Sequence, residues 1–288
     1  MGLWIVYLVW GSTYLAIRVM VETVPPLLGA GARFSFAGAV MVAVVAARRG
    51  IAAVRVGPAE LRGALLVGTL LCGANAVVTV AEQEVPSAIA ALLVATVPLW
   101  VLCLRRSAGE RVTRAGLAAV LVGFGGVALL MLPGEQTAGA SLLALLAVVA
   151  AALAWASGSF LAPRSALPAD QFASTGWQML LGGAMCLLAG LAAGEAPDVD
   201  PARFSADSVL AFAYLVVFGS WLAFTAYAWL LQHAPLSKVS TYAYVNPVVA
   251  IVLGWLILDE AITALTLAGA AVIVASVALI VRVEAPRR

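Results

Sequence analysis

Ten runs of apolar residues follow one another along the chain, separated by short polar connections. Each run is close to the roughly 20 residues that a helix needs to cross the hydrocarbon core of a bilayer. The runs are continuously apolar rather than alternating, which favours helices over the strands of a membrane β-barrel. We number them runs 1 to 10: 2–20, 27–47, 63–81, 87–104, 115–132, 140–162, 172–193, 208–231, 236–257 and 263–281. The pattern predicts an all-α polytopic membrane protein with ten transmembrane helices.

The composition supports a membrane protein and excludes an ordinary soluble domain. Of the 288 residues, 64% are hydrophobic and 10% are charged, whereas a soluble domain carries about 25% charged residues. The three cysteines, Cys72, Cys103 and Cys186, all lie inside apolar runs and show no CxxC spacing. Such cysteines are more typical of core-filling residues than of a disulfide framework or a metal site. We therefore expect no metal and no cofactor.

Charge is distributed unevenly between the connections. If the N-terminus is cytoplasmic, the inner connections hold most arginines, including Arg48, Arg105 and Arg164, and the outer connections hold only Arg203. Most acidic residues then fall outside. This asymmetry matches the excess of Lys and Arg in cytoplasmic loops, so it predicts an N-in/C-in topology. Run 1 follows no basic segment and no cleavage site, so we expect a retained span rather than a signal peptide.

The two halves of the chain resemble each other. With an offset of 145, Trp10 aligns with Trp155 and Gly38 with Gly183; with an offset of 149, Pro98 aligns with Pro247. Each half then contains five runs, residues 1–133 and 139–284. Because five is odd, the second half enters the membrane from the opposite face. The sequence thus predicts two inverted five-helix repeats, an architecture typical of secondary transporters.

Pro98 and Pro247 stand at equivalent points of runs 4 and 9. Each lies about 12 residues into its run, or roughly 18 Å along a helix, which is near the midplane. A proline inside a helix removes one hydrogen bond and bends the helix. We expect these two residues to act as hinges of a gate, and the alternative is a kink that serves packing alone.

Polar and aromatic residues form stripes at helical spacing on some runs and are nearly absent from runs 5 and 10. Residues three or four apart share one face of a helix. The stripes predict the side chains of a central substrate pathway: Trp10, Tyr14, Asn75, Thr79, Trp155, Ser159, Trp221, Tyr227, Thr241, Tyr244 and Asn246. The structural alternatives are interfacial aromatic belts, hydroxyls bonded to their own helix, and amides that bond between helices. In runs 5 and 10, Gly123, Gly126 and Gly269 favour close helix packing.

Two arginines, Arg18 and Arg33, belong to no connection. Glu22, Glu82 and Glu84 would lie beside them at the outer side, so we expect a salt-bridged cluster there. We assign Arg18 and Glu82 to an outer gate and Arg33 to structural pairing. No acidic residue lies inside a run, which favours uniport or exchange, or weak coupling through Glu82, over proton coupling by a buried carboxylate.

Three segments carry a resemblance to a known family. WGSTYLAIRV followed by GARF, VPSAIAALLVATVPLW, and STYAYVNPVVAIVLGWLILDEAIT resemble the EamA family of the drug/metabolite transporter superfamily. The resemblance covers essentially the whole chain. It implies a ten-helix basket with both ends in the cytoplasm and a cavity lined mainly by helices 1, 3, 4, 6, 8 and 9. It also implies a bacterial inner-membrane exporter of amino acids or other small metabolites.

We predict a secondary transporter, and in particular an exporter, of small metabolites such as amino acids or amphipathic and aromatic compounds. The predicted partners are a small-molecule substrate and the lipid bilayer, without nucleic acid, and the oligomeric state stays open, a monomer included. Two alternatives stay open. A carrier of sugar-phosphate or nucleotide-sugar anions would need several Lys or Arg residues in its cavity. A non-transporting membrane sensor would need a soluble output domain, and the ten runs leave no room for one. An enzyme is not expected, because the chain has no HExxH and no GxSxG.

Overall fold

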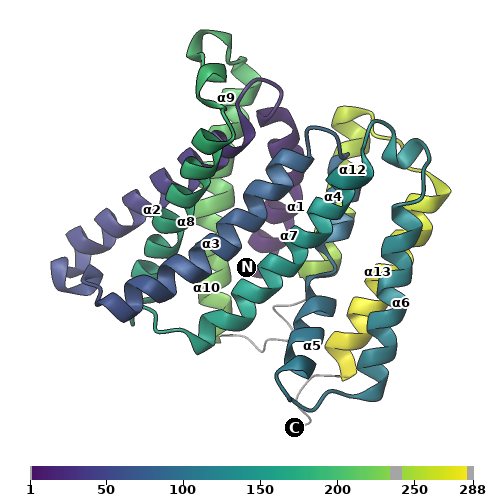
Figure 1. Cartoon of the computed structure of the whole chain (residues 1–288), viewed down its shortest axis with the longest axis horizontal. Helices are drawn as coiled ribbons and strands as arrows, with labels where there is room; N and C mark the ends of the chain where they lie inside the picture. The colour runs from purple at the N-terminus through teal and green to yellow at the C-terminus, as the bar shows by residue number, and fades with distance from the viewer. Residues whose placement is uncertain (1, 234–241, 284–288) are drawn as a thin grey trace.

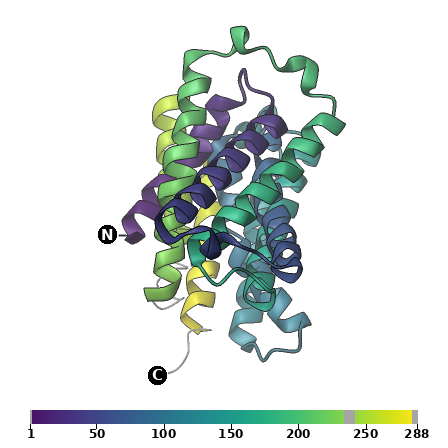
Figure 2. The ribbon, with the colours of Figure 1, turned by 90° about the vertical axis from the view of Figure 1, so that its left-hand side faces the viewer.

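A computed structural model describes residues 2–233 and 242–283, without the side chains of 228, 231–233 and 244 (Figures 1 and 2). The described chain is helical and contains no strand. Eight helical stretches are long and apolar enough to cross a membrane, and Arg114–Leu130 and Val245–Leu258 are shorter apolar helices. The helices are α1 (Gly2–Met20), α2 (Pro26–Arg49), α3 (Pro58–Ala81), α4 (Ser87–Val94), α5 (Val97–Ser107), α6 (Arg114–Leu130), α7 (Leu142–Leu161), α8 (Gln171–Ala192), α9 (Ala206–Tyr214), α10 (Ala223–His233), α12 (Tyr242–Leu258) and α13 (Ala264–Val283).

Run 4, which we predicted as one helix, is broken in the middle. α4 ends at Val94 and α5 begins at Val97, with Pro98 in its first turn. Proline lacks an N–H and is tolerated in the first turn of a helix, where that N–H would have no partner. The Thr96 hydroxyl donates to the Leu93 carbonyl at 2.5 Å and satisfies one group freed by the break. Pro247 differs, because it lies inside the continuous helix α12.

Run 8 contains a feature that the sequence pattern did not indicate. Between α9 and α10, the stretch η6 (Leu215–Leu222) is π-helical. Such stretches are rare and occur frequently at functional sites. The Gly219 carbonyl accepts a hydrogen bond from Nε1 of Trp10 at 3.3 Å, so this stretch contacts α1 through its backbone.

Helices at equivalent places in the two sequence halves pack against each other: α2 against α8, and α6 against α13. Glycines allow the close approach, since a Cβ on Gly38 would lie 2.6 Å from the carbonyl oxygen of Gly176. Between α6 and α13, a Cβ on Gly269 would lie 2.5 Å from Leu130 and one on Gly126 would lie 2.9 Å from Ile273. The predicted role of Gly126 and Gly269 in close helix packing is confirmed.

Figure 1 shows α6 and α13 along one side of the molecule, α2 and α8 on the other, and α1, α4, α7 and α12 between them. The connections gather at two opposite ends. Glu195, which follows α8, accepts from the N–H groups of Leu27 and Leu28, at 3.1 and 2.8 Å, and so caps α2. Glu260 caps α4 in the same way, accepting from Ser87 and Ala88 at 2.7 and 3.0 Å.

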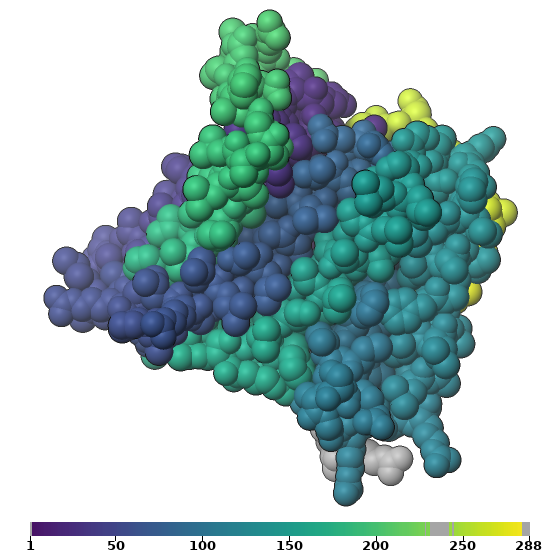
Figure 3. All heavy atoms as spheres, viewed as in Figure 1, coloured from purple at the N-terminus to yellow at the C-terminus, as the bar shows by residue number. Residues whose placement is uncertain are grey.

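The lower end is basic and holds ion pairs between connections. The Glu110 carboxylate contacts Arg105 at 2.8 Å and Arg164 at 2.5 Å, which joins the α5–α6 connection to the end of α7. Arg49 at the end of α2 pairs with Asp170 at the start of α8. At the upper end, the connection between α8 and α9 projects beyond the body of the molecule in the space-filling view (Figure 3).

Candidate functional site

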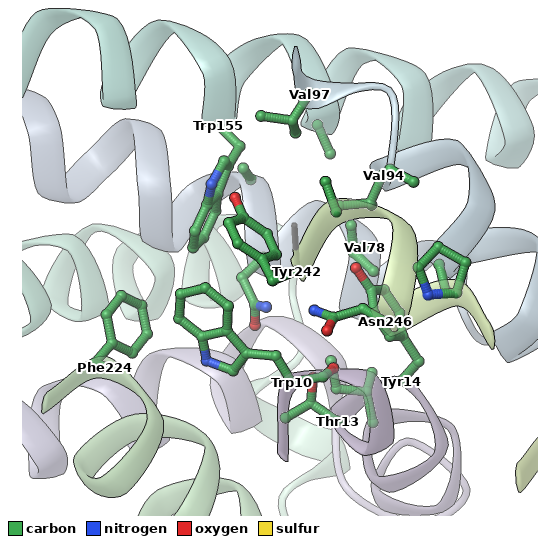
Figure 4. A pocket seen from close by; sticks show the side chains of 18 of the residues that line it. Trp10, Thr13, Tyr14, Val78, Val94, Val97, Trp155, Phe224, Tyr242 and Asn246 are labelled. Atoms are coloured by element: carbon green, nitrogen blue, oxygen red, sulfur yellow. The ribbon is translucent and has the colours of Figure 1, made fainter. Parts of the chain in front are cut away.

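A cavity lies at the centre of the helix bundle (Figure 4). It measures about 80 Å³, counted as the space that the centre of a water molecule can occupy, which is room for several waters. Side chains from α1, α3, α4, α7, α10 and α12 form most of its wall, and α2 adds Arg33. The lining residues are Trp10, Thr13, Tyr14, Ile17, Arg33, Ala74, Asn75, Val78, Ala91, Val94, Ala95, Val97, Ala151, Trp155, Phe224, Tyr242, Ala243, Asn246 and Pro247.

Aromatic rings gather around Trp10 on one side of this cavity. The Trp10 ring centroid lies 5.3 Å from Phe224, 5.4 Å from Tyr242 and 6.2 Å from Trp155. These three contacts are edge-on, an arrangement that aromatic quadrupoles favour. Tyr227 lies 4.9 Å from Trp10 in a tilted arrangement, next to the same group. The cluster provides flat apolar surface that suits the ring or hydrocarbon part of a ligand.

Polar side chains lie on other parts of the wall. With its amide nitrogen turned toward them, Asn246 donates to the carbonyls of Tyr242 and Tyr7, each at 3.2 Å. The Thr13 hydroxyl donates to the Trp10 carbonyl at 2.7 Å. The Asn75 amide oxygen accepts from Nη1 of Arg33 at 3.2 Å, and the Ser220 hydroxyl accepts from Nε of Arg33 at 3.0 Å.

The expectation that Arg18 and Arg33 belong to a salt-bridged cluster is wrong for the part of the chain that the structure describes. Neither arginine forms an ion pair there. Arg33 is 3% exposed and points into the bundle toward Asn75 and Ser220, away from the acidic connections. Arg18 donates to the main-chain carbonyl of Glu82 rather than to its carboxylate. The cluster does not form because Arg33 lies too deep in α2 to reach the connections.

Several predicted pathway residues do line the cavity: Trp10, Tyr14, Asn75, Trp155 and Asn246, and so does Pro247, which was predicted as a gate residue. Others lie elsewhere. The hydroxyls of Thr79 and Ser159 each donate at 2.8 Å to a carbonyl of their own helix, that of Asn75 and that of Trp155 respectively. Trp221 donates from Nε1 to the Ala37 carbonyl at 3.0 Å and packs against α2. Thr241 lies outside the described residues, as does the side chain of Tyr244.

The predicted gate residues Arg18 and Glu82 lie at the upper end, near an open vestibule of about 240 Å³ measured in the same way. This vestibule is lined by Arg18, Glu22, Glu84, Pro86, Ala138, Leu258 and Glu260. Glu82 follows α3 directly and is 0% exposed. Neither of its carboxylate oxygens has a hydrogen-bond partner among the described residues. Burial, together with the nearby Glu260 carboxylate, raises the pKa of Glu82 well above its ordinary value.

Glu84, two residues further on, behaves in the opposite way. It is exposed, and the pKa of its carboxyl is lowered by hydrogen bonding with the Ser141 side chain and with the Ser141 N–H, which donates to it at 3.1 Å. We expected both residues to lie in one cluster at the outer side. In the structure Glu84 lines the vestibule, whereas Glu82 is buried and does not.

The sequence pattern missed Arg33 as a cavity residue and missed most of the apolar wall. Arg33 does not belong to a stripe of polar residues on its helix, so the helical spacing did not indicate it. A charged residue inside a membrane helix is nevertheless a sign of a functional site. The small wall residues, such as Ala91, Ala95 and Ala151, carry no chemical signal in an alanine-rich chain. Their place follows only from how the helices cross.

Comparison with known proteins agrees with this architecture. The model of the EamA-like transporter family matches residues 1–132 and 142–282. The chain is 38% identical over 282 residues to the uncharacterized inner membrane transporter YedA of Escherichia coli, covering 97% of this chain and 89% of that protein. It is 25% identical over 279 residues to the uncharacterized transporter YoaV of Bacillus subtilis, covering 95% and 93%. A crystal structure of a protein that is 22% identical in sequence aligns with this chain at a TM-score of 0.65. The alignment covers 99% of this chain and 98% of that protein's chain, and it supports the fold.

Proposed function

Because the chain belongs to the EamA-like transporter family, we propose that it is a secondary transporter that exports small metabolites across the bacterial inner membrane. The substrates would be amino acids or amphipathic and aromatic compounds. The observation that carries the proposal is the central cavity, which has an aromatic side around Trp10 and a polar side at Asn75 and Asn246. A site of this kind, mostly apolar with a few polar groups that orient the ligand, is typical of small-molecule binding.

The proposed topology has ten membrane crossings, both termini in the cytoplasm, and two inverted repeats of five helices. The basic lower end supports this orientation, since it holds Arg49, Arg105 and Arg164 in ion pairs with acidic partners. The excess of arginine on one side follows the rule for cytoplasmic loops. The pairing of α2 with α8 and of α6 with α13 supports the repeat.

The proposed mechanism is alternating access, in which the cavity opens to one side at a time. In this proposal, the aromatic cluster around Trp10 would close the cavity on one side, and Arg18 and Glu82, near the vestibule, would act as the gate on the other. The break before Pro98 gives α4 and α5 a place to bend. Pro247 lines the cavity and leaves a helix without one backbone hydrogen bond, so α12 can bend there as well.

Transport by reconstituted protein tests the proposal. Purified protein in liposomes would be assayed for flux with a panel of amino acids, aromatic acids and sugar phosphates, with and without a pH gradient. Saturable flux of an amino acid or aromatic compound is the expected result. Thermal stabilisation by a compound without any flux would indicate a sensor instead, and flux restricted to sugar phosphates would replace the proposed substrate class. Uphill flux driven by the pH gradient alone and retained by Glu82→Gln would contradict uniport or exchange.

A further inference from the structure

Arg33 brings a positive charge to the central cavity from α2, and no acidic residue in the described part of the chain pairs with it. It is 3% exposed. Its guanidinium lies over the ring of the neighbouring Phe34, 4.6 Å from the centroid. A buried charge without a counter-ion is costly, so a residue of this kind in a membrane protein usually marks a site for an ion or a charged ligand.

The hydrogen bonds of Arg33 leave part of its guanidinium free. Arginine has five N–H donors. Nε donates to Ser220 and Nη1 donates to Asn75, while Nη2 has no hydrogen-bond partner among the described residues. The Asn75 oxygen is already an acceptor for Arg33, so its amide N–H groups are the part of Asn75 left for a ligand. Arg33 and Asn75 therefore offer several donors to the cavity, which favours an anion.

The backbone of η6 leaves room for the Arg33 guanidinium. A Cβ on Gly219 would lie 3.0 Å from Nη2 of Arg33 and 3.1 Å from Cγ2 of Thr13. A side chain at this position would press on the guanidinium, and glycine leaves it room. The π-helical stretch thus supplies both the Ser220 hydroxyl that holds Nε and the space beside Nη2.

We propose that Arg33 and Asn75 bind a carboxylate group of the transported substrate, whose apolar part lies against the aromatic cluster around Trp10. This inference rests on the proposed transport function and names a group that its substrate carries. A guanidinium pairs well with the two oxygens of a carboxylate. One arginine in the cavity wall suits a singly charged group better than the several charges of a sugar phosphate or nucleotide.

Matched ligand pairs test the proposal: phenylacetate against phenylacetamide, and phenylalanine against phenylalaninamide. Each pair keeps the ring and replaces the carboxylate by a neutral amide. Thermal stabilisation of the purified protein and flux in liposomes would be measured for both members. We expect wild type to prefer the carboxylate by about tenfold or more, as charge-assisted hydrogen bonds would give. A wild type that binds the amides as well as the carboxylates overturns the inference.

Two variants separate recognition from a merely structural role of Arg33. Arg33→Gln removes the charge and is expected to abolish the preference for carboxylates while amide binding stays. Asn75→Asp places a carboxylate beside Arg33, which neutralises the arginine without moving it. This variant strengthens the contact between residues 33 and 75, yet it is also expected to abolish the preference for carboxylates. Arg48→Gln, at an exposed position of the same helix, is the control and should keep the preference.

The outcomes distinguish this inference from the proposed transport. If Asn75→Asp is folded and keeps the preference, Arg33 does not recognise the carboxylate, whether or not Arg33→Gln can be purified. If amides and carboxylates are transported equally, the inference fails and the transport function stands. If carboxylates stabilise wild type but nothing is transported, the binding site stands and the transport function fails.

Discussion

Two glycines of α3 have opposite surroundings, and they predict opposite effects of the same substitution. A Cβ on Gly68 would meet the backbone of Gln178 on α8, with 2.9 Å to its carbonyl carbon and 3.0 Å to its Cα, and would clash directly with its carbonyl oxygen. A Cβ on Gly73, less than two turns away on the same helix, would have nothing within 4 Å. Gly68→Ala is therefore expected to destabilise the protein, and Gly73→Ala is the matched control.

The magnitude follows from these distances. Non-bonded carbons pack best at about 3.5–4.0 Å, so the contact with the Gln178 carbonyl carbon alone requires α3 and α8 to separate by about 0.6 Å. The nearer carbonyl oxygen requires a larger separation to accept a methyl group in place of the hydrogen of Gly68. Overpacking of this kind costs about 1–3 kcal/mol. In the control, replacing an unpacked helical glycine by alanine gains up to about 1 kcal/mol. The two variants are thus expected to differ by roughly 1–4 kcal/mol, with Gly68→Ala the less stable.

Thermal unfolding of the purified protein in detergent measures this difference, with both variants in the same buffer. Flux in liposomes adds a functional reading, because Asn75 lies two turns beyond Gly68 on α3 and a shifted helix would displace it from the cavity. Equal melting temperatures for Gly68→Ala and Gly73→Ala would refute the close crossing of α3 and α8.

The remaining predictions concern buried and capping carboxylates. Glu82→Gln is expected to raise the melting temperature near neutral pH, because burial raises the pKa of Glu82 and the folded state keeps a proton that the unfolded state has released. The gain should disappear below about pH 4, where Glu82 is protonated in both the folded and the unfolded state. If Glu82→Gln and wild type melt at the same temperature at both neutral and acidic pH, Glu82 is hydrated rather than buried. Glu260→Gln weakens the cap of α4 at Ser87 and Ala88 and is expected to cost about 1 kcal/mol in the same assay. The exposed Glu135→Gln is the control, and equal losses in the two variants would contradict the capping role.

The sequence predicted the all-helical membrane architecture because long apolar runs allow few alternatives in a membrane. The break at Pro98 was also predictable, since proline has no N–H to donate. The π-helical stretch η6 was not, because Leu215–Leu222 has no proline and no pattern that differs from an α-helix. The stretch is hydrogen-bonded to Trp10 and Arg33, which lie on other helices and are far away in the sequence.

The candidate site was predicted in part, and the errors have a common cause. Helical spacing says which residues share a face, but it does not say which way that face points. Trp221 and Tyr227 belong to one stripe, yet Trp221 bonds to α2 and Tyr227 packs beside Trp10. Arg33 was assigned to a pairing because the predicted topology placed Glu22, Glu82 and Glu84 at the same outer side, whereas in the structure it turns toward Asn75. These directions depend on how the helices cross.

The central claim is that the cavity is the path of the substrate, and two neighbouring alanines of α7 test it most directly. Ala151 lines the cavity and Ala150 is exposed on the outside of the same helix. The measurement is saturable flux in liposomes for Ala151→Leu and Ala150→Leu, each checked for folding by its melting temperature. The account predicts that Ala151→Leu falls to the background of protein-free liposomes while Ala150→Leu transports like wild type. A folded Ala151→Leu variant with wild-type flux would contradict it.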